Sequence, residues 1–405
     1  MQVNRVPATV GENVAYSSRN SKRALLNNVR PRIYRRCTRC VMDTSDPQIA
    51  FNADGECNHC TEFLSVRSRF KYHGRESDDA LEREIEKIKA AGRGRVYDCV
   101  VGVSGGVDSS YVAIEAVKRG LRPLAVHLDN GWDSETAVTN IRNLVDRLGI
   151  DYESVVLNWE EFRDLQLSFL RASVPEAETP TDAAIPAAVH RVAAKHGIRY
   201  VISGGNLATE GILPKSWHYN ARDLKYLKHI HKSFGSRPLR SFPTFGFAAE
   251  SYYKVLRGIK TFYFLNYVSF FKAGAKERLR AEFGWKDYGG KHHESRYTKF
   301  IQSCYLVEKF GIDYRRATFS ALICGDEMTR EEALAELEVP AFEPDEVEQE
   351  KRYIAKKLAI TLEELEQIVS APPKYYWDYP NSDERLTMLY NTYRRIFKLE
   401  KLSTT

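Results

Sequence analysis

The chain has 405 residues, of which 43% are hydrophobic and 28% charged, with seven cysteines and a net charge of +6. This composition fits a globular protein of two or three domains, and it excludes wholesale disorder, a fibre and a disulfide-stapled mini-protein. The positive charge is local, because residues 1–36 carry eight Lys/Arg and one acid, Glu12, whereas the rest is nearly neutral. We expect residues 1–33 to form a flexible basic arm. The neutral body argues against a large nucleic-acid footprint.

Compartment is indicated by apolar runs and cysteine usage. No stretch approaches the roughly 20 apolar residues that span a bilayer, and the N-terminus lacks the apolar segment of a secretory signal. In a reducing compartment, paired cysteines bind metal or do redox chemistry more often than they form disulfides. The sequence therefore predicts a cytoplasmic protein without a membrane span.

Four cysteines have the spacing C-x2-C-x16-C-x2-C: Cys37, Cys40, Cys57 and Cys60. Two such pairs supply four soft ligands in a tetrahedron, which suits zinc, and Asp54-Gly55 between them marks a hairpin turn. We predict a structural four-cysteine zinc ribbon over residues 34–75, with an iron–sulfur cluster or a redox pair as alternatives. His59 could compete as a ligand, but four thiolates complete the site without it.

Helix and strand patterns then alternate. Apolar residues at helical spacing predict a connecting helix within residues 76–94. Over residues 95–215, short apolar runs separated by helical patterns predict βαβ units and a parallel sheet. The expected strands are 98–103, 123–128, 152–157 and 199–203, and the expected helices are 107–119, 134–148 and 183–196.

The strand signal fades after about residue 220. Residues 216–405 are expected to be mostly helical, and Thr329 with Glu332 and Thr361 with Glu364 have capping-box spacing. The predicted helices are 221–232, 273–283, 295–310, 330–338, 346–358, 362–369 and 383–399. The fold class is thus α/β, with a zinc ribbon before the parallel sheet and a helical region after it.

A glycine-rich loop follows the strand that ends at Val103. Its residues 104–110 read Ser-Gly-Gly-Val-Asp-Ser-Ser and open a helix. Adjacent glycines let the backbone approach a ligand closely, and the helix N-terminus attracts an anion. Asp108 would repel a phosphate unless it holds Mg²⁺. The alternative is a simple turn with an acid at a helix N-terminus, where acids are favoured anyway. Neither the kinase-type P-loop nor the dinucleotide glycine pattern is present.

SGGVDSS after a buried strand resembles the PP-loop of the ATP pyrophosphatase superfamily. The wider sequence resembles the N-acetyl sugar amidotransferases of surface-polysaccharide biosynthesis, from about Cys37 to about Pro340. The segments that carry this resemblance are CTRCVMDTSDPQIAFNADGECNHC, TPTDAAIP, YVISGGNLATEGILPKSW, ARDLKYLKHIHKSFG, FGWKDYGGKHHES and LICGDEMTREEAL.

The resemblance implies an ATP-dependent reaction in lipopolysaccharide O-antigen synthesis. AMP is transferred to the oxygen of an N-acetyl group on a nucleotide-linked diacetamido sugar or sugar acid, and ammonia then converts that group to an acetamidino group. Magnesium and loop N–H groups would stabilise the pyrophosphate. The residues implied to bind ATP are Val103, Ser104, Gly105, Gly106, Asp108, Ser109, Ser110, Asp129, Asn130, Gly204, Gly205 and Asn206. Gly204-Gly205 could instead be a strand-ending turn.

Substrate and catalytic residues are expected within the same family-like segments. Asp108, Ser104, Lys215, His292 and His293 are implied in catalysis, and the histidine pair could act as a base for ammonia or lie at the surface. Arg222, Lys225, Lys228 and Lys232 form one basic helical face, which meets a phosphate or carboxylate or is simply solvated. The residues implied to contact the sugar nucleotide are Thr181, Asp182, Glu210, Lys215, Arg222, Lys225 and Glu294.

Ammonia is expected from a separate protein. Gln2, rather than a nucleophilic cysteine, follows Met1, and no glutaminase module is apparent. The resemblance suggests a two-subunit glutaminase partner like that of imidazole glycerol phosphate synthesis.

Two other functions remain open. A PP-loop tRNA thiolase also combines zinc cysteines with this loop, but it calls for a reactive cysteine, and Cys99, Cys304 and Cys324 form no close pair in sequence. A non-enzymatic zinc-ribbon binding protein would require a decayed PP-loop, whereas SGGVDSS is intact.

Overall fold

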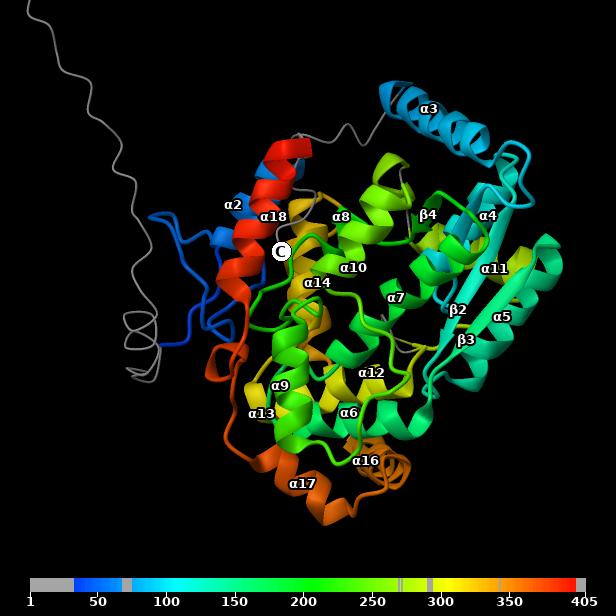
Figure 1. Ribbon diagram of the computed structural model, residues 1–405. Helices are drawn as coiled ribbons and strands as arrows, with labels where there is room; N and C mark the ends of the chain where they lie inside the picture. The colour runs from blue at the N-terminus through cyan, green and yellow to red at the C-terminus, as the bar shows by residue number, and fades with distance from the viewer. Residues whose placement is uncertain are drawn as a thin grey trace, which may run out of the picture. The chain divides into compact units, whose positions relative to one another are not determined.

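The computed structural model describes residues 33–67, 75–268, 270, 272–289, 294–341 and 344–397. Contacts divide the chain into two units, Met1–Arg35 and Arg36–Thr405, and the second holds all the described helices and strands (Figure 1). The predicted arm, residues 1–33, lies outside the described residues except for Ile33.

A five-stranded parallel sheet has the order β3-β2-β1-β4-β5. Its strands are β1 Cys99–Gly102, β2 Pro123–Asp129, β3 Tyr152–Val156, β4 Tyr200–Ser203 and β5 Lys260–Tyr263. The chain moves outward from β1 through β2 to β3, and then places β4 on the other side of β1. The loops after β1 and β4 therefore lie beside each other at the carboxyl edge, where open α/β sheets bind their ligands.

Helices cover both faces of this sheet (Figure 1). Val100 and Val201 belong to the face that packs against α7 (Thr179–Lys195). Their neighbours Val101 and Ile202 point the other way, because strand side chains alternate between faces. That second face packs against α3 Arg75–Gly92, α4 Val107–Lys118, α5 Glu135–Leu148 and α11 Lys272–Phe283. Burial on both sides explains why β1 and β4 are almost wholly apolar, whereas β3, with the sequence YESVV, is exposed at alternate residues.

The first four strands and their helices agree with the sequence predictions, and the parallel α/β class is confirmed. The expectation that strands end near residue 220 is wrong, because β5 extends the sheet beside β4. An unpredicted helix, α6 (Trp159–Arg171), follows β3. It begins at an N-cap, Asn158, whose side chain accepts a hydrogen bond from the N–H of Glu161.

The second half of the chain is mostly helical, as predicted. Thr329 and Glu332 form the expected capping box, and the Thr361 hydroxyl accepts from the Glu364 N–H. The predicted helix 295–310 contains a π-helical segment, η3, between two α-helices. The elements are α8 Leu207–Glu210, α9 Leu224–Phe234, α10 Phe247–Ser251, η1 Tyr252–Leu256, η2 Phe264–Tyr267, α12 Arg296–Phe300, η3 Ile301–Tyr305, α13 Leu306–Phe310, α14 Arg315–Cys324, α15 Arg330–Glu338, α16 Pro344–Leu358, α17 Leu362–Ser370, η4 Tyr376–Asp378 and α18 Asp383–Phe397. Among the described residues, no helix has the length and apolar character needed to cross a bilayer.

The cysteine module at the front of the chain contains single bridges rather than full strands. Phe51 pairs with Cys57 around a turn at Gly55, whose φ is +80°. Cys60 lies on the helix that follows, α2 (Asn58–Arg67). The module packs into one hydrophobic cluster with residues of α14 and α16, so its core is continuous with that of the helical region.

Candidate active site

The loop between β1 and α4 has a shape that requires glycine. Gly105 has a φ of +78°, and a Cβ at this position would lie 2.5 Å from the carbonyl oxygen of Ala137. The indole of Trp285 donates to the Gly105 carbonyl at 2.9 Å. Gly106 is the N-cap of α4, and no side chain caps that helix end. The start of α4 thus has no N-cap side chain, as suits an anion-binding helix end, and the Tyr288 phenol contacts the Val107 backbone there.

Serine hydroxyls line this loop, as the sequence predicts. The Ser104 and Ser109 hydroxyl oxygens lie 3.2 Å apart, and the Gly106 N–H donates to Ser104 Oγ at 3.3 Å. Ser110 differs because it is fully buried, and its hydroxyl has no hydrogen-bond partner among the described residues. Val103 lies buried at the base of the loop.

Two carboxylates from distant parts of the chain meet at this loop. Asp108 lies in the first turn of α4, and the Ser104 hydroxyl approaches Glu294 Oε1 at 3.5 Å. Both face Tyr288, and its pKa is raised by burial first and then by the Glu294 and Asp108 charges. Carboxylate oxygens are the ligands that Mg²⁺ prefers in proteins. The donor set thus fits a cation that accompanies bound phosphates.

The loop after β4 touches the loop after β1. A Cβ on Gly204 would lie 3.2 Å from the Ser109 backbone nitrogen, so a larger residue would press the two loops apart. Asn206 caps α8, since its Oδ1 accepts from the Thr209 N–H at 2.9 Å. Next to it, a Cβ on Gly205 would approach Glu210 Oε2 at 3.3 Å. The structure thus brings 204–206 and Glu210 beside the glycine loop.

The end of β2 is tied to the start of α7. Asp129 Oδ1 accepts from the Gly131 N–H at 2.9 Å. Asn130 Nδ2 donates to Thr181 Oγ1 at 3.4 Å. These bonds bring the predicted adenosine residues and the predicted substrate residues to one edge of the sheet.

A polar cluster extends from α7 to the segment after α8. His218 Nε2 lies 3.8 Å from Asp182 Oδ2, and each side chain is 34% exposed. Glu178 and Glu210 also face His218, but burial outweighs their charges and lowers the pKa of the imidazole. The sequence interpretation missed His218, although it directly follows the family-like segment that ends at Trp217.

Two predicted substrate residues, Lys215 and Arg222, lie near acids outside the His218 cluster. Lys215 forms an ion pair with Asp383 of α18, and its ammonium lies 5.6 Å from the ring centre of Tyr376. Arg222 precedes α9 instead of lying on its basic face, because that helix begins only at Leu224, after the N-cap Asp223. The guanidinium of Arg222 lies 3.6 Å from Glu250 Oε1.

A cavity of about 370 Å³ lies beside these residues. Arg222 and Lys225 line it together with residues of α10 and α18. Tyr263, at the end of β5, lies beside the loop after β4, since a Cβ on Gly205 would lie 3.5 Å from the tyrosine ring. Burial raises the pKa of Tyr263 and the Arg222 charge opposes this shift. His292 and His293, the predicted catalytic pair, lie outside the described residues.

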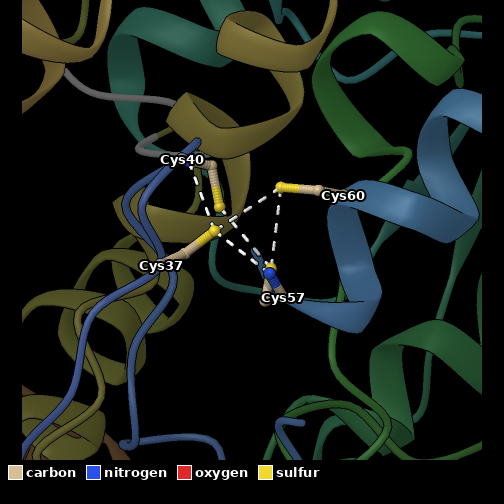
Figure 2. A group of neighbouring side chains, drawn as sticks. All are labelled: Cys37, Cys40, Cys57 and Cys60. Carbon is tan, nitrogen blue, oxygen red and sulfur yellow. Dashed lines mark hydrogen bonds between the residues drawn. The ribbon is translucent and has the colours of Figure 1, made fainter. Parts of the chain in front are cut away.

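The four predicted metal ligands converge on one point (Figure 2). All their sulfur atoms lie within 4.8 Å of one another, and three of the separations are 3.6, 3.7 and 3.8 Å. Four sulfurs about 2.3 Å from a central zinc would lie roughly 3.8 Å apart. The backbone N–H of Cys57 also donates to Cys37 Sγ at 3.2 Å, as suits a thiolate. The donor set and spacing therefore fit zinc.

A fifth cysteine adjoins the quartet. Cys324, at the end of α14, has its sulfur 3.6 Å from that of Cys60. Contact with Cys324, followed by the other three thiols, raises the pKa of Cys60. Four thiolates at this density need a cation among them. Sequence spacing gave no sign of Cys324, because it lies 264 residues from Cys60.

Buried hydrogen bonds join the cysteine module to the segment that carries His218. His59, between the second pair of cysteines, contacts Asp46 with 2.8 Å between Nε2 and Oδ2. The Ser216 hydroxyl donates to the other Asp46 oxygen at 2.6 Å. Asp46 and Ser216 are fully buried. The module thus supports the chain two residues before His218.

Comparison with known protein families gives two matches. Residues 294–396 match the C-terminal domain of the lipopolysaccharide (LPS) biosynthesis protein WbpG-like family, and residues 75–178 match NAD synthase. Together, the two matches support a lipopolysaccharide-related PP-loop amidotransferase family for this chain. This confirms the family that the sequence motifs predict. The two matches support an ATP-using, amidotransferase-like role of the C–N ligase type.

Individual relatives are more distant. A probable mitochondrial tRNA-specific 2-thiouridylase 1 of Caenorhabditis elegans is 34% identical over 95 residues, and the match spans 20% of this chain and a quarter of that protein's length. NMN synthetase from Francisella tularensis is 16% identical, with 55% of this chain and 96% of that chain covered and a TM-score of 0.28. NAD+ synthetase from Burkholderia pseudomallei is 17% identical, with 56% and 100% covered and a TM-score of 0.27. These TM-scores are too low to carry an argument.

The family's two matched segments meet at the polar cluster. Thr298 and Gln302 of the WbpG-like domain donate to the two carboxylate oxygens of Glu178. Glu294, at the start of that domain, reaches the PP-loop. The candidate site is therefore built from both segments of the chain.

Proposed function

We propose that the protein converts an N-acetyl group of a nucleotide-activated diacetamido sugar, or sugar acid, into an acetamidino group. ATP is cleaved to AMP and pyrophosphate, and ammonia supplies the new nitrogen. The observation that carries this proposal is that the WbpG-like domain reaches the PP-loop through Glu294 and the polar cluster around His218 through Glu178. An amide is a poor electrophile, so the reaction needs both a nucleotide site and an acid–base site.

The chain's own groups have separate parts in this proposal. The N–H groups at the start of α4 and the hydroxyls of Ser104 and Ser109 would bind the ATP phosphates. Asp108 and Glu294 would hold Mg²⁺, which would neutralise charge on the pyrophosphate as it leaves. Arg222 and Lys225, beside the cavity, would attract the phosphates or carboxylate of the sugar nucleotide.

The remaining predictions belong to the same proposal. The four cysteines would hold one structural zinc ion. A separate glutaminase would deliver the ammonia. Reducing conditions such as those of the cytoplasm would suit the seven free cysteines.

The properties of the cysteine thiols argue against a tRNA thiolase. Burial raises the pKa of Cys304 to about 12 and also raises that of Cys99, whereas a thiol nucleophile must ionise readily. Cys324 lies against the metal cluster. Cys99 and Cys304 thus do not resemble the activated thiol that a thiolase requires.

The direct test combines the protein with ATP, Mg²⁺, ammonium and a panel of nucleoside-diphosphate diacetamido sugars and their uronic acids. We expect a product about one mass unit lighter, since NH replaces oxygen, together with AMP and pyrophosphate. AMP release without a modified sugar would point to another acceptor. Absence of reaction with every member of the panel would contradict the proposal.

A further inference from the structure

The polar cluster contains one histidine that can exchange protons at neutral pH. We propose that His218 removes a proton from ammonia as it attacks the activated carbon, and that Asp182 orients the His218 ring. This inference rests on the proposed amidotransferase function. The expectation that His292 or His293 supplies the base stays an alternative prediction, since those residues lie outside the described part of the chain.

The surroundings of His218 suit a base. Its side chain remains 34% exposed, so a reactant can reach it. Burial lowers its pKa although Glu178 and Glu210 oppose the shift, so the imidazole is neutral and able to accept a proton at pH 7. Nε2 lies 3.8 Å from Asp182 Oδ2, beyond hydrogen-bond distance, so Asp182 would orient the ring through its charge and the other ring nitrogen would meet the reactant. An oriented imidazole backed by a carboxylate is a recurrent general base.

The groups around His218 come from four elements. Glu178 and Asp182 belong to the start of α7, and Glu210 ends α8. Tyr314 lies near the same three carboxylates, and burial keeps its pKa well above the usual value. Lys215, on the same segment as His218, is already paired with Asp383. The cluster is therefore acidic, and it attracts the amidinium cation that the reaction forms.

The position of His218 relative to the sheet also suits a base for this reaction. The charge of Glu210 acts on the imidazole, and a Cβ on Gly205, beside the PP-loop, would lie 3.3 Å from Glu210 Oε2. Asn130, at the end of β2, bonds to Thr181, which is adjacent to Asp182. His218 thus lies at the carboxyl edge of the sheet, where the activated acetyl group would be presented.

The step balances as follows. Transfer of AMP to the amide oxygen releases pyrophosphate and gives an O-adenylyl imidate that keeps the amide proton on the sugar nitrogen. The lone pair of ammonia forms a bond to the imidate carbon, and the carbon–nitrogen π pair moves to the sugar nitrogen. His218 accepts one proton from the new ammonium group. The freed lone pair then forms a carbon–nitrogen double bond, and the carbon–oxygen bond breaks with its electron pair leaving on AMP.

The test compares His218→Asn with native protein on the sugar panel under saturating ATP, Mg²⁺ and ammonium. Loss of a general base slows the chemical step about 10²- to 10⁴-fold, so we expect that loss in kcat with little change in ATP affinity by calorimetry. When the concentration of free ammonia is held constant across pH, the acid limb of the native pH–rate profile should disappear in the variant. Hydroxylamine, whose attached ammonium group is more acidic than that of ammonia, should restore much of the rate.

His196→Asn is the matched control. His196 also pairs with a carboxylate, Glu153, at 2.8 Å and is 28% exposed, but it lies at the amino edge of the sheet, beside the start of β4. This variant should keep the native rate and pH profile. If native protein is active and His218→Asn is equally active with an unchanged acid limb, the inference is overturned while the proposed function stands. If native protein modifies no sugar, both fall.

A second measurement does not depend on the variant's folding. Selective isotope labelling of histidine in the full chain allows His218 to be titrated by nuclear magnetic resonance. We expect its pKa to lie below the usual value of about 6.5. A pKa above 7 would leave the imidazole protonated at working pH and would contradict its assignment as the base.

Discussion

Gly105 shows how much of the site depends on one residue. Its φ of +78° is strained for any residue with a side chain, and a Cβ would collide with the Ala137 carbonyl. We predict that Gly105→Ala displaces the loop, weakens ATP binding at least about tenfold and lowers the free energy of unfolding by more than the roughly 1–2 kcal/mol of left-handed strain alone. Calorimetry with ATP and Mg²⁺, together with urea unfolding, measures both effects.

Gly94 provides the matched control for that substitution. Its φ is +75°, but a Cβ there would meet nothing within 4 Å. Gly94→Ala should therefore lose only about 1 kcal/mol of stability from backbone strain and keep native ATP affinity. Equal ATP affinity in both variants would show that the loop does not bind the nucleotide.

The buried carboxyl group of Glu176 should make the free energy of unfolding depend on pH. It is almost fully buried, the Tyr226 hydroxyl donates to one of its oxygens, and burial raises its pKa to about 7. An unfolded glutamate loses its proton at about pH 4.3. Between about pH 4 and 7 the folded state therefore binds more protons, and the free energy of unfolding falls as pH rises, by up to about 4 kcal/mol from this group.

Glu176→Gln removes this titration while keeping the side-chain shape. The difference in unfolding free energy between native protein and Glu176→Gln should thus change between pH 5 and 7 and level off above that range. Glu338→Gln, at an exposed position, should show no such change. A pH-independent difference for Glu176→Gln would mean that Glu176 is ionised in the folded state throughout.

At the scale of elements, the sequence predicted helices and strands correctly where burial imposes a clear apolar pattern. β1 and β4 are buried on both faces and stand out as apolar runs. The sequence prediction missed β5 because it is a short edge strand in which only Phe262 is buried. Its pattern therefore differs little from that of a loop. α6 could have been found, since Asn158 precedes two acids in its first turn.

The site was predictable where one segment supplies the geometry. The PP-loop and the cysteine pairs are local motifs. His218, Asp46 and Cys324 acquire their partners only through folding, and a single sequence holds no periodic signal for contacts over such separations. Glu294 was predicted from its family-like segment, but its contact with Ser104 joins residues 190 positions apart.

The segment that leads to His218 is joined to the cysteine module, and a substitution at Ser216 tests whether this contact supports the site. Ser216 joins it to Asp46 through a buried hydrogen bond. Ser216→Ala leaves a buried carboxylate oxygen with one donor fewer, which costs about 1–3 kcal/mol. We expect lower stability from urea unfolding and a lower kcat, because the neighbouring His218 loses its support.

Ser168→Ala serves as the control for Ser216→Ala. Ser168 is also fully buried, but its hydroxyl donates only to a carbonyl of its own helix, that of Asp164. Its loss should change stability less and leave kcat unchanged. If the two variants behave alike, the bond between Ser216 and Asp46 does not support the site.

At the scale of the whole molecule, the cysteine module is continuous with the rest of the chain from Arg36 onward. Its four cysteines share one hydrophobic cluster with residues from the α6, α14 and α16 helices. Arg330, at the start of α15, donates to the carbonyls of Cys37 and Cys40. Arg316 of α14 binds the Val41 carbonyl. Loss of the metal should therefore disturb α14 and α15 as well as the module.

Metal removal tests that continuity. We expect one zinc per chain by elemental analysis and a lower Tm after chelation. Hydrogen exchange should then rise in residues 315–338 as well as in 37–60, because structural zinc contributes folding energy directly. Cys40→Ser should lose the zinc, whereas Cys99→Ala, a buried cysteine of the other core, should retain it. Exchange that rises only within 37–60 would show that the module unfolds alone and that its contacts with α14 and α15 contribute little stability.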